Sequence, residues 1–146
     1  MQGKINYFFE EINVFRYGLP RKGWINACLS KEGKNIGVIN FIFCSDKYLK
    51  KINEKYRGKS YLTDVISFNT MPPEFIQNMN DTLVFGDIFI SVTRVKANKQ
   101  LYKTIFAKEL KRVMIHGALH LIGFNDTTPK ERVVMAEKEN IYLELR

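Results

Sequence analysis

The chain has 146 residues and a mass of 17.1 kDa, about the length of one domain and enough to bury a hydrophobic core without disulfides. Hydrophobic residues make up 45% and charged residues 26%, which excludes a disordered chain, a collagen-like chain and a disulfide scaffold. The 23 Lys and Arg against 15 Asp and Glu give a net charge of +8, which indicates an anionic partner without identifying it.

Nothing in the sequence predicts export or membrane insertion. The N-terminal apolar stretch is short and runs directly into Glu10 and Glu11, unlike a signal peptide. The longest apolar run, residues 38–44, is far shorter than the ~20 residues of a membrane-spanning helix. Cys28 and Cys44 lack C-x-x-C spacing and are expected to be reduced thiols. We therefore expect a soluble, cytoplasmic protein with no membrane partner.

Hydrophobic periodicity predicts a single domain, residues 1–146, of the mixed α/β or α+β class. The first expected elements are a strand at 5–10, a helix at 21–31 and a strand covered on both faces at 36–44. A helix should follow from an Asp46 N-cap to about Tyr56, before Gly58, and then strands at 64–68 and 83–91 on either side of a loop at 70–82. The remaining elements are a helix from about 93 that breaks near Asn98, a helix at 104–122 and a helix from Pro129. Together they predict a sheet of about four strands and about four or five helices, with the sheet packed against the helix at 104–122.

Both histidines of the chain, His116 and His120, fall in the predicted helix at 104–122. Their four-residue spacing places them on one face, roughly 6 Å apart, so that both imidazoles can bind one metal ion. Gly123 is expected to end the helix, and Asp126 is then the first side chain beyond it with a metal-binding group other than an amide. The pattern H-x3-H-x2-G-x2-D therefore predicts a three-ligand metal site, with zinc as the expected ion.

The loop that carries Asp126 is expected to be short and fixed. Thr128, Pro129 and Glu131 have the pattern of a capping box with proline at the first helical position, so a new helix should begin just after Asp126. The competing interpretation is a helix that buries two hydrogen-bonded histidines in the core. Because all the histidines lie together and precede a helix end and a carboxylate, the sequence favours the metal site over that alternative.

The same pattern is similar to the zincin motif H-E-x-x-H-x-x-G-x-x-H, but Gly117 occupies the position of the catalytic glutamate. A metalloprotease needs that glutamate to take a proton from water bound to the metal, so peptide hydrolysis is disfavoured. Glycine inside a helix costs ~1 kcal/mol relative to alanine, which indicates that backbone or substrate approaches closely at Gly117.

Residues 116–126, HGALHLIGFND, resemble the H-G-x-L-H-L-x-G-Y-D-H signature of the YbeY family, bacterial metal-dependent endoribonucleases of ribosomal RNA maturation. Two further blocks agree with this resemblance. Residues 53–68 resemble the family's N-x-x-Y-R-x-x-x-x-x-T-D-V-L-S-F block, and residues 86–91 resemble its G-D-I-x-I-S strand. The three blocks follow one another in the family's order.

The resemblance implies a single-strand-specific endoribonuclease that acts in ribosomal RNA maturation and ribosome quality control, with RNA or ribosomal particles rather than DNA as its partner. It implies one divalent metal ion on His116, His120 and Asp126, and Arg57 as the catalytic residue. A guanidinium suits this role because it binds phosphate through two hydrogen bonds and offsets charge at phosphorus.

The signature departs from the family pattern at its end. Asp126 replaces the family's last histidine, Asn125 its aspartate and Phe124 its tyrosine. A carboxylate ligand is workable for zinc, but it lowers the net charge at the ion and shifts preference toward Mn²⁺ or Fe²⁺. The sequence therefore leaves the identity of the metal open, and equally whether water or the RNA 2′-hydroxyl is the nucleophile.

Two other functions remain open at this point. The chain could be a ribosome-associated RNA-binding factor with a structural metal, or a metallohydrolase of another substrate on a zincin-like site. Asp64 and Asp87 lie near strands, where either could be a hydrogen-bond partner of a metal-binding histidine or of Arg57. Such residues more often cap turns or end strands, so neither is included in the predicted site. Basic residues at 47–59 and 94–112 usually form solvated helix faces, but would track an RNA backbone if they border the metal cleft.

Overall fold

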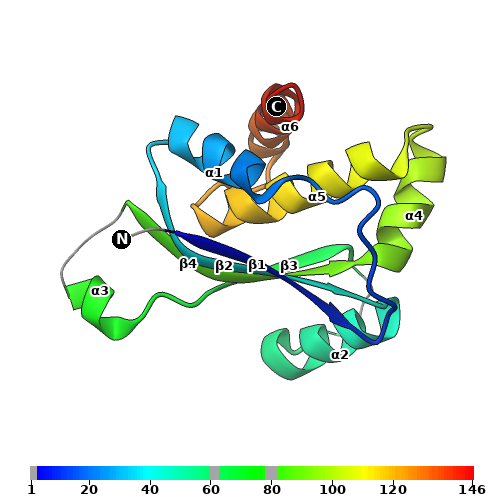
Figure 1. The fold of residues 1–146 in the computed structure, drawn as a ribbon, viewed down its shortest axis with the longest axis horizontal. Coiled ribbons are helices and arrows are strands. Elements are labelled where there is room, and N and C mark those ends of the chain that lie inside the picture. The colour runs from blue at the N-terminus through cyan, green and yellow to red at the C-terminus, as the bar shows by residue number, and fades with distance from the viewer. Residues whose placement is uncertain (1–2, 60–62, 78–81) are drawn as a thin grey trace.

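The computed structural model, which describes residues 3–59, 63–77 and 82–146, has the predicted mixed α/β fold around a four-stranded sheet (Figure 1). The strands are β1 (Lys4–Glu10), β2 (Asn35–Cys44), β3 (Val65–Asn69) and β4 (Leu83–Ser91), in the spatial order β1-β2-β4-β3. β1, β2 and β4 are parallel to one another, whereas β3 is antiparallel to β4 and forms one edge of the sheet.

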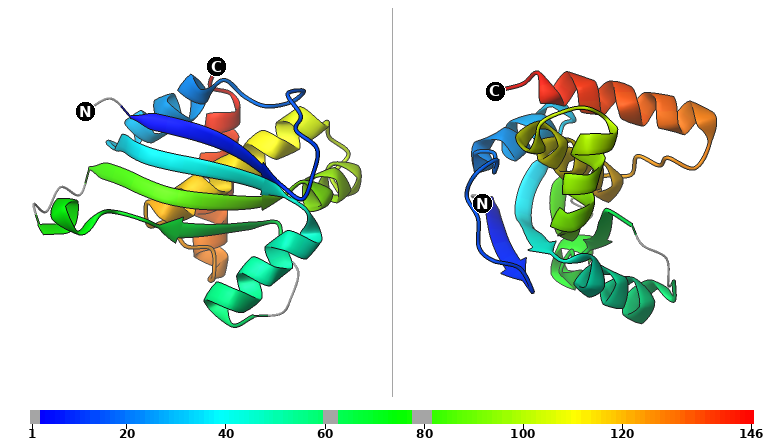
Figure 2. Two further views of the ribbon diagram at one scale, coloured as in Figure 1. Left: turned by 60° about the horizontal axis from the view of Figure 1, so that its bottom comes forward. Right: turned by 90° about the vertical axis from the view of Figure 1, so that its right-hand side faces the viewer.

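The described helices are distributed unequally over the two faces of the sheet. They are α1 (Lys22–Lys31), α2 (Asp46–Arg57), α3 (Pro73–Gln77), α4 (Val92–Leu101), α5 (Phe106–Leu121) and α6 (Pro129–Leu143). Figures 1 and 2 show α1, α4, α5 and α6 on one side of the sheet and α2 on the other, with α6 outside α5. The short helix α3 lies in the segment that was expected to be a loop, which brings the described helices to one more than predicted.

The core lies mainly between the sheet and α1, α5 and α6. As predicted, β2 is covered on both faces: Phe41 and Phe43 are fully buried in the main core, and Cys44 joins a smaller cluster with Leu49 and Ile66 under α2. Both cysteines are buried free thiols, and burial raises the pKa of each to about 12. Within the described residues, no helix combines the length and the apolar character that crossing a membrane requires.

Two details of the predicted helices are wrong. The N-cap of α2 is Ser45, whose Oγ accepts a hydrogen bond from the Tyr48 amide, because Asp46 instead accepts one from Ser91 and pairs with Arg94 at 3.2 Å. Helix α4 does not break at Asn98 but runs on to Leu101. The Gly58 end of α2 is confirmed, with φ of 65°.

Gly117 allows α5 to lie directly on the sheet. A Cβ at this position would lie 2.7 Å from Cγ2 of Ile88 on β4 and 2.9 Å from Cγ2 of Val65 on β3. The Ser67 hydroxyl of β3 also donates a hydrogen bond of 2.8 Å to the Gly117 carbonyl. The glycine therefore has a packing role, and it holds the histidine-bearing end of α5 against the edge strand of the sheet.

Candidate metal centre and cleft

His116, His120 and Asp126 meet at one point, at the C-terminal end of α5 and the loop that follows it. Nε2 of His120 lies 3.0 Å from Nε2 of His116, and Oδ2 of Asp126 lies 3.2 Å and 3.3 Å from the Nε2 atoms of His116 and His120. The three predicted ligand atoms thus form a nearly equilateral triangle. None of the three side chains is fully buried, so the triangle is open to solvent on one side.

The end of α5 explains how the chain returns toward the histidines. Gly123 has φ of +106° and its amide donates to the His120 carbonyl, while the Phe124 amide donates to the Leu119 carbonyl. These two hydrogen bonds and the left-handed glycine form a Schellman motif, in which the helix ends and the chain reverses. The predicted role of Gly123 is confirmed, and the reversal carries Asp126 back over the helix end.

The next helix fixes the other side of the loop. The Thr128 hydroxyl accepts a hydrogen bond from the Glu131 amide, the Glu131 carboxylate accepts one from the Thr128 amide, and Pro129 is the first residue of α6. The predicted capping box is therefore confirmed. The Schellman motif precedes Asp126 and the capping box follows it, and each is fixed by its own hydrogen bonds. The backbone on both sides therefore holds Asp126 in place, unlike a residue on a free loop.

The triangle has the size that a tetrahedral zinc site requires. Zinc bonds to imidazole nitrogen and carboxylate oxygen of about 2.0–2.1 Å place neighbouring ligand atoms about 3.3 Å apart in a tetrahedron. The three separations in this chain lie close to that distance. Two imidazoles and one carboxylate also form a donor set that zinc and other divalent transition metals accept. The residues present therefore fit a divalent metal ion.

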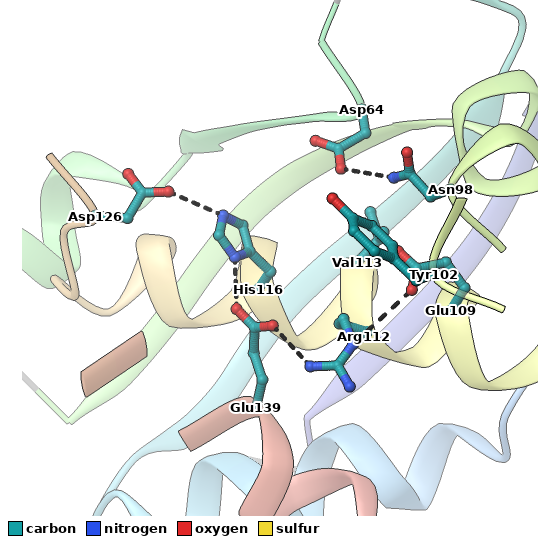
Figure 3. Close-up of a pocket in the computed structure, with 9 residues that line it drawn as sticks. All are labelled: Asp64, Asn98, Tyr102, Glu109, Arg112, Val113, His116, Asp126 and Glu139. Carbon is teal, nitrogen blue, oxygen red and sulfur yellow. Dashed lines mark hydrogen bonds and ion pairs between the residues drawn. The ribbon is translucent and has the colours of Figure 1, made fainter. Parts of the chain in front are cut away.

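His116 also contacts Glu139 of α6, a residue outside the predicted site. Oε2 of Glu139 lies 2.7 Å from Nδ1 of His116, and Oε1 lies 3.3 Å from a guanidinium nitrogen of Arg112 (Figure 3). Burial lowers the pKa of His116, but the hydrogen bond to Glu139 and the charges of Glu139, Asp64 and Asp126 outweigh it and raise the pKa. With Nδ1 donating to Glu139, Nε2 faces the other two predicted ligands.

The sequence of α6 indicates that Glu139 faces the core. Met135, Glu139 and Tyr142 are the buried residues of α6, at the i, i+4, i+7 spacing of a core-facing stripe. A glutamate in such a stripe requires a partner, because a buried charge is costly unless it is paired. The sequence could not say that the partner is His116, because the two residues lie 23 positions apart.

Arg57 lines the same cleft as the three predicted ligands. It is the last residue of α2 and exposed, and the cleft of about 490 Å³ is bounded by Arg57, His116, His120 and Asp126 together with residues 63–67 of the edge strand and the segment before it. α2 and α5 lie on opposite faces of the sheet (Figure 2), and Arg57 and the two histidines reach the same cleft beside β3. A positively charged fork and a three-ligand centre thus share one cavity.

The two aspartates that were left outside the site occupy different faces. Asp64 lines the cleft and accepts a hydrogen bond from the Asn98 amide at 3.3 Å. Asp87 accepts one from Asn40 and lines a pocket beneath α2, on the side of the sheet away from α5. Asp64 is therefore near the predicted centre, whereas Asp87 is not.

Several of the basic residues near the site have structural partners. Arg94 pairs with Asp46, Arg112 pairs with Glu139, and the ammonium of Lys111 lies 4.7 Å from the centre of the Trp24 ring. Those three contribute to packing between helices. Helix α2, which ends at Arg57, carries exposed lysines, of which Lys51 pairs with Glu11 at 3.9 Å; they are Lys47, Lys50, Lys51 and Lys55.

Comparisons with known proteins agree over nearly the whole chain. The family model described as Endoribonuclease YbeY matches residues 9–145. Endoribonuclease YbeY of Karelsulcia muelleri is 46% identical over 95% of this chain and 93% of its own length, and that of Christiangramia forsetii is 43% identical over 94% and 91%. The solution structure of TM1509 from Thermotoga maritima superposes with a TM-score of 0.59 at 29% identity, covering 96% of this chain and 87% of that one. The chain belongs to the endoribonuclease YbeY family.

Proposed function

We propose that this endoribonuclease cleaves single-stranded RNA with one divalent metal ion, zinc first among the candidates, held by His116, His120 and Asp126. The observation that carries the metal is the triangle of ligand atoms, 3.0–3.3 Å on each side, beside an arginine. Ribosomal RNA is the proposed substrate, in maturation and quality control of ribosomal particles in the cytoplasm. The net charge of +8 supports a polyanionic partner of this kind.

The metal ion, when bound, supplies a Lewis acid that withdraws charge from a phosphate oxygen. Other residues of this chain fix the side chains that bind the ion. Glu139 accepts a hydrogen bond from Nδ1–H of His116, which fixes the imidazole in the tautomer whose Nε2 can bind the ion. The Schellman motif and the capping box fix the third ligand, Asp126.

Arg57 is proposed to bind the scissile phosphate and to offset the charge that develops on it. Its guanidinium is permanently charged and planar, and offers two parallel N–H groups to two phosphate oxygens. Because Arg57 lies at the end of α2 and lines the cleft, its side chain can reach an RNA strand bound across the cleft. Arg57 therefore acts on the charge of the phosphoryl group, whereas the ligand triangle holds the ion.

Peptide hydrolysis is the weaker use of this site. The position of the zincin glutamate is Gly117, and a Cβ there would collide with Ile88 and Val65. A glutamate in its place would have no space on this backbone. The absence of that base does not count against RNA cleavage, because either water or the 2′-hydroxyl of the substrate can serve as nucleophile.

A cleavage assay with purified protein tests the proposal. Single-stranded RNA should be cut, double-stranded RNA of the same sequence should be spared, and a chelator should abolish cutting until zinc or manganese is returned. A 2′,3′-cyclic phosphate at the new end would assign the attack to the 2′-hydroxyl, and its absence to water. Cleavage that persists in the presence of the chelator would overturn metal dependence. Tight RNA binding with no cleavage, whichever divalent metal is added, would favour the non-catalytic assembly factor.

A further inference from the structure

A second cavity, of about 560 Å³, shares His116, Asp126 and Asp64 with the cleft that Arg57 lines, but Arg57 does not line it. Its remaining lining comes from the start of α5, the end of α4, α6 and Asp64, and Figure 3 shows the ring of Tyr102 between Asp64 and Asn98 on one side and Glu109 and Arg112 on the other. The volume is within the range of small-ligand pockets, about 300–1,000 Å³. The metal site and Asp64 thus border two adjoining cavities.

Glu109 is the unusual residue of this cavity. It is 2% exposed, yet among the described residues none donates a hydrogen bond to its Oε1, and Nε of Arg112 is 3.8 Å away. Burial, with the nearby carboxylates of Asp64 and Glu139, raises the pKa of Glu109 despite Arg112 and Asn98. A buried acceptor that lacks a donor destabilises the protein, so a ligand that supplies an N–H group would recover the missing hydrogen bond.

Tyr102 gives the same cavity a flat aromatic surface. It caps α4 and is 64% exposed, and within the described part of the chain its side chain makes no hydrogen bond and no ring contact. Exposed aromatic rings beside a cleft are stacking surfaces for the bases of single-stranded RNA. The cavity therefore combines an aromatic face with hydrogen-bond acceptors, Glu109 and Asp64, beside the centre where the phosphate is proposed to bind.

A second metal ion is the less suitable occupant. Within residues 3–59, 63–77 and 82–146, only the group of His116, His120 and Asp126 brings three ligand atoms within 4.8 Å of one another. The carboxylates of Asp64, Glu109 and Glu139 do not converge in that way. A planar ligand with hydrogen-bond donors suits the aromatic and carboxylate lining of this cavity better than a cation does.

We propose that this cavity binds the nucleobase next to the scissile phosphate, stacked on Tyr102, and selects a base with an exocyclic amino group over uracil. This rests on the proposed function, because it assumes that RNA lies across the metal centre. Cytosine and uracil are the sharpest comparison: they have the same size, but cytosine offers an amino group where uracil has a carbonyl oxygen. An ionised carboxylate of Glu109 or Asp64 can accept a hydrogen bond from the amino group of cytosine, but it has no donor for the carbonyl oxygen of uracil.

Nucleotide binding tests the proposal without requiring cleavage. Cytidine and uridine 5′-monophosphate are titrated into the zinc-loaded protein and followed by NMR shifts of Asn98 and Tyr102. Cytidine monophosphate should bind about tenfold more tightly in the native chain. Glu109→Gln should reduce the difference to near zero, since an amide offers uracil a donor. Tyr102→Ala should weaken both nucleotides alike, and the exposed residues Glu137→Gln and Tyr17→Ala are matched controls that should change neither.

The outcomes separate this proposal from the one on which it rests. Equal binding of the two nucleotides, a difference that survives Glu109→Gln, or shifts confined to other surfaces would overturn the base pocket. A second equivalent of metal that is lost in Glu109→Gln would overturn it in favour of a cation. If cytidine monophosphate is preferred but no RNA is cut, the base pocket stands and the proposed function fails. The surface variant Tyr102→Ala keeps the test valid should Glu109→Gln not fold.

Discussion

Nδ1 of His116 lies 2.7 Å from Oε2 of Glu139, and this contact ties the predicted metal centre on α5 to the last helix of the chain. The carboxylate also accepts a hydrogen bond from Arg112 and is nearly buried. An imidazole held in this way presents Nε2 to a metal in one orientation and one tautomer. We therefore propose Glu139 as a positioning residue for the proposed metal ligand His116.

Replacing Glu139 should weaken metal binding. We expect Glu139→Ala to lower zinc affinity about 10–100-fold, the usual effect of losing a carboxylate behind a metal-binding histidine. Glu139→Gln keeps an acceptor for Nδ1–H and should lose less. Competition with a chromogenic chelator measures this directly. The exposed neighbour Glu137→Ala is the control, and an equal loss of affinity in both alanine variants would contradict the role of Glu139.

Gly117 should tolerate no side chain. A Cβ 2.7 Å from Ile88 and 2.9 Å from Val65 must push α5 off the sheet, so Gly117→Ala should lower the free energy of unfolding by about 1–3 kcal/mol. A Cβ added to Gly23 of α1 would meet nothing within 4 Å, and Gly23→Ala should leave stability unchanged or raise it by up to ~1 kcal/mol. Urea unfolding of the two variants provides the comparison; similar effects at both sites would rule out the packing role.

Arg57 should matter for turnover and not for metal content. Arg57→Lys keeps the positive charge but loses the planar pair of donors, so kcat should fall about 100-fold while zinc content stays at the native value. Single-turnover cleavage of single-stranded RNA and metal analysis of the same sample measure both. Lys55→Ala, on the same helix, is the matched control. A kcat of Arg57→Lys equal to that of the native chain would show that Arg57 has no catalytic role.

Glu32 should make part of the stability dependent on pH. Burial alone would raise the pKa of Glu32, but hydrogen bonds from Tyr142 and Lys138 and the charge of Lys138 outweigh it, so the pKa is lowered. A lowered pKa stabilises the fold above the unfolded-state value, about 4.3, and this contribution disappears as pH falls through the lower folded value.

The measurement is the difference in unfolding free energy between the native chain and Glu32→Gln across pH. That difference should be constant above about pH 5 and shrink toward lower pH. Glu144→Gln, at an exposed position near the C-terminus, should show no such trend. A difference between native chain and Glu32→Gln that grows as pH falls would have the wrong sign for this explanation.

The parts of the fold and site that were predictable depend on local patterns. The strand at 36–44, the left-handed Gly123 and the capping box at Thr128 follow from neighbouring residues, and all three are confirmed. The spacing of His116 and His120 likewise placed two imidazoles on one helix face. Local hydrogen bonds and helix periodicity decide such features, so the sequence carries them.

The parts that were not predictable depend on contacts between distant segments. Asp46 has the residue type of a cap, but Arg94, 48 positions later, takes its carboxylate, and Ser45 caps the helix instead. Glu139 lies 23 positions from His116, and the packing role of Gly117 requires the position of Ile88. The common cleft of Arg57 and the histidines was expected only from the family resemblance, since the β3 edge that brings them together is a matter of strand order.

The most direct test of the metal centre combines metal analysis and RNA cleavage on three proteins: the native chain, His120→Ala and Asp126→Ala. We predict about one equivalent of metal in the native chain, a large loss in both variants, and a parallel loss of single-stranded RNA cleavage. Circular dichroism should show that all three are folded. Unchanged metal content in both variants, or full cleavage after the metal is lost, would contradict a metal-dependent nuclease centre at these residues.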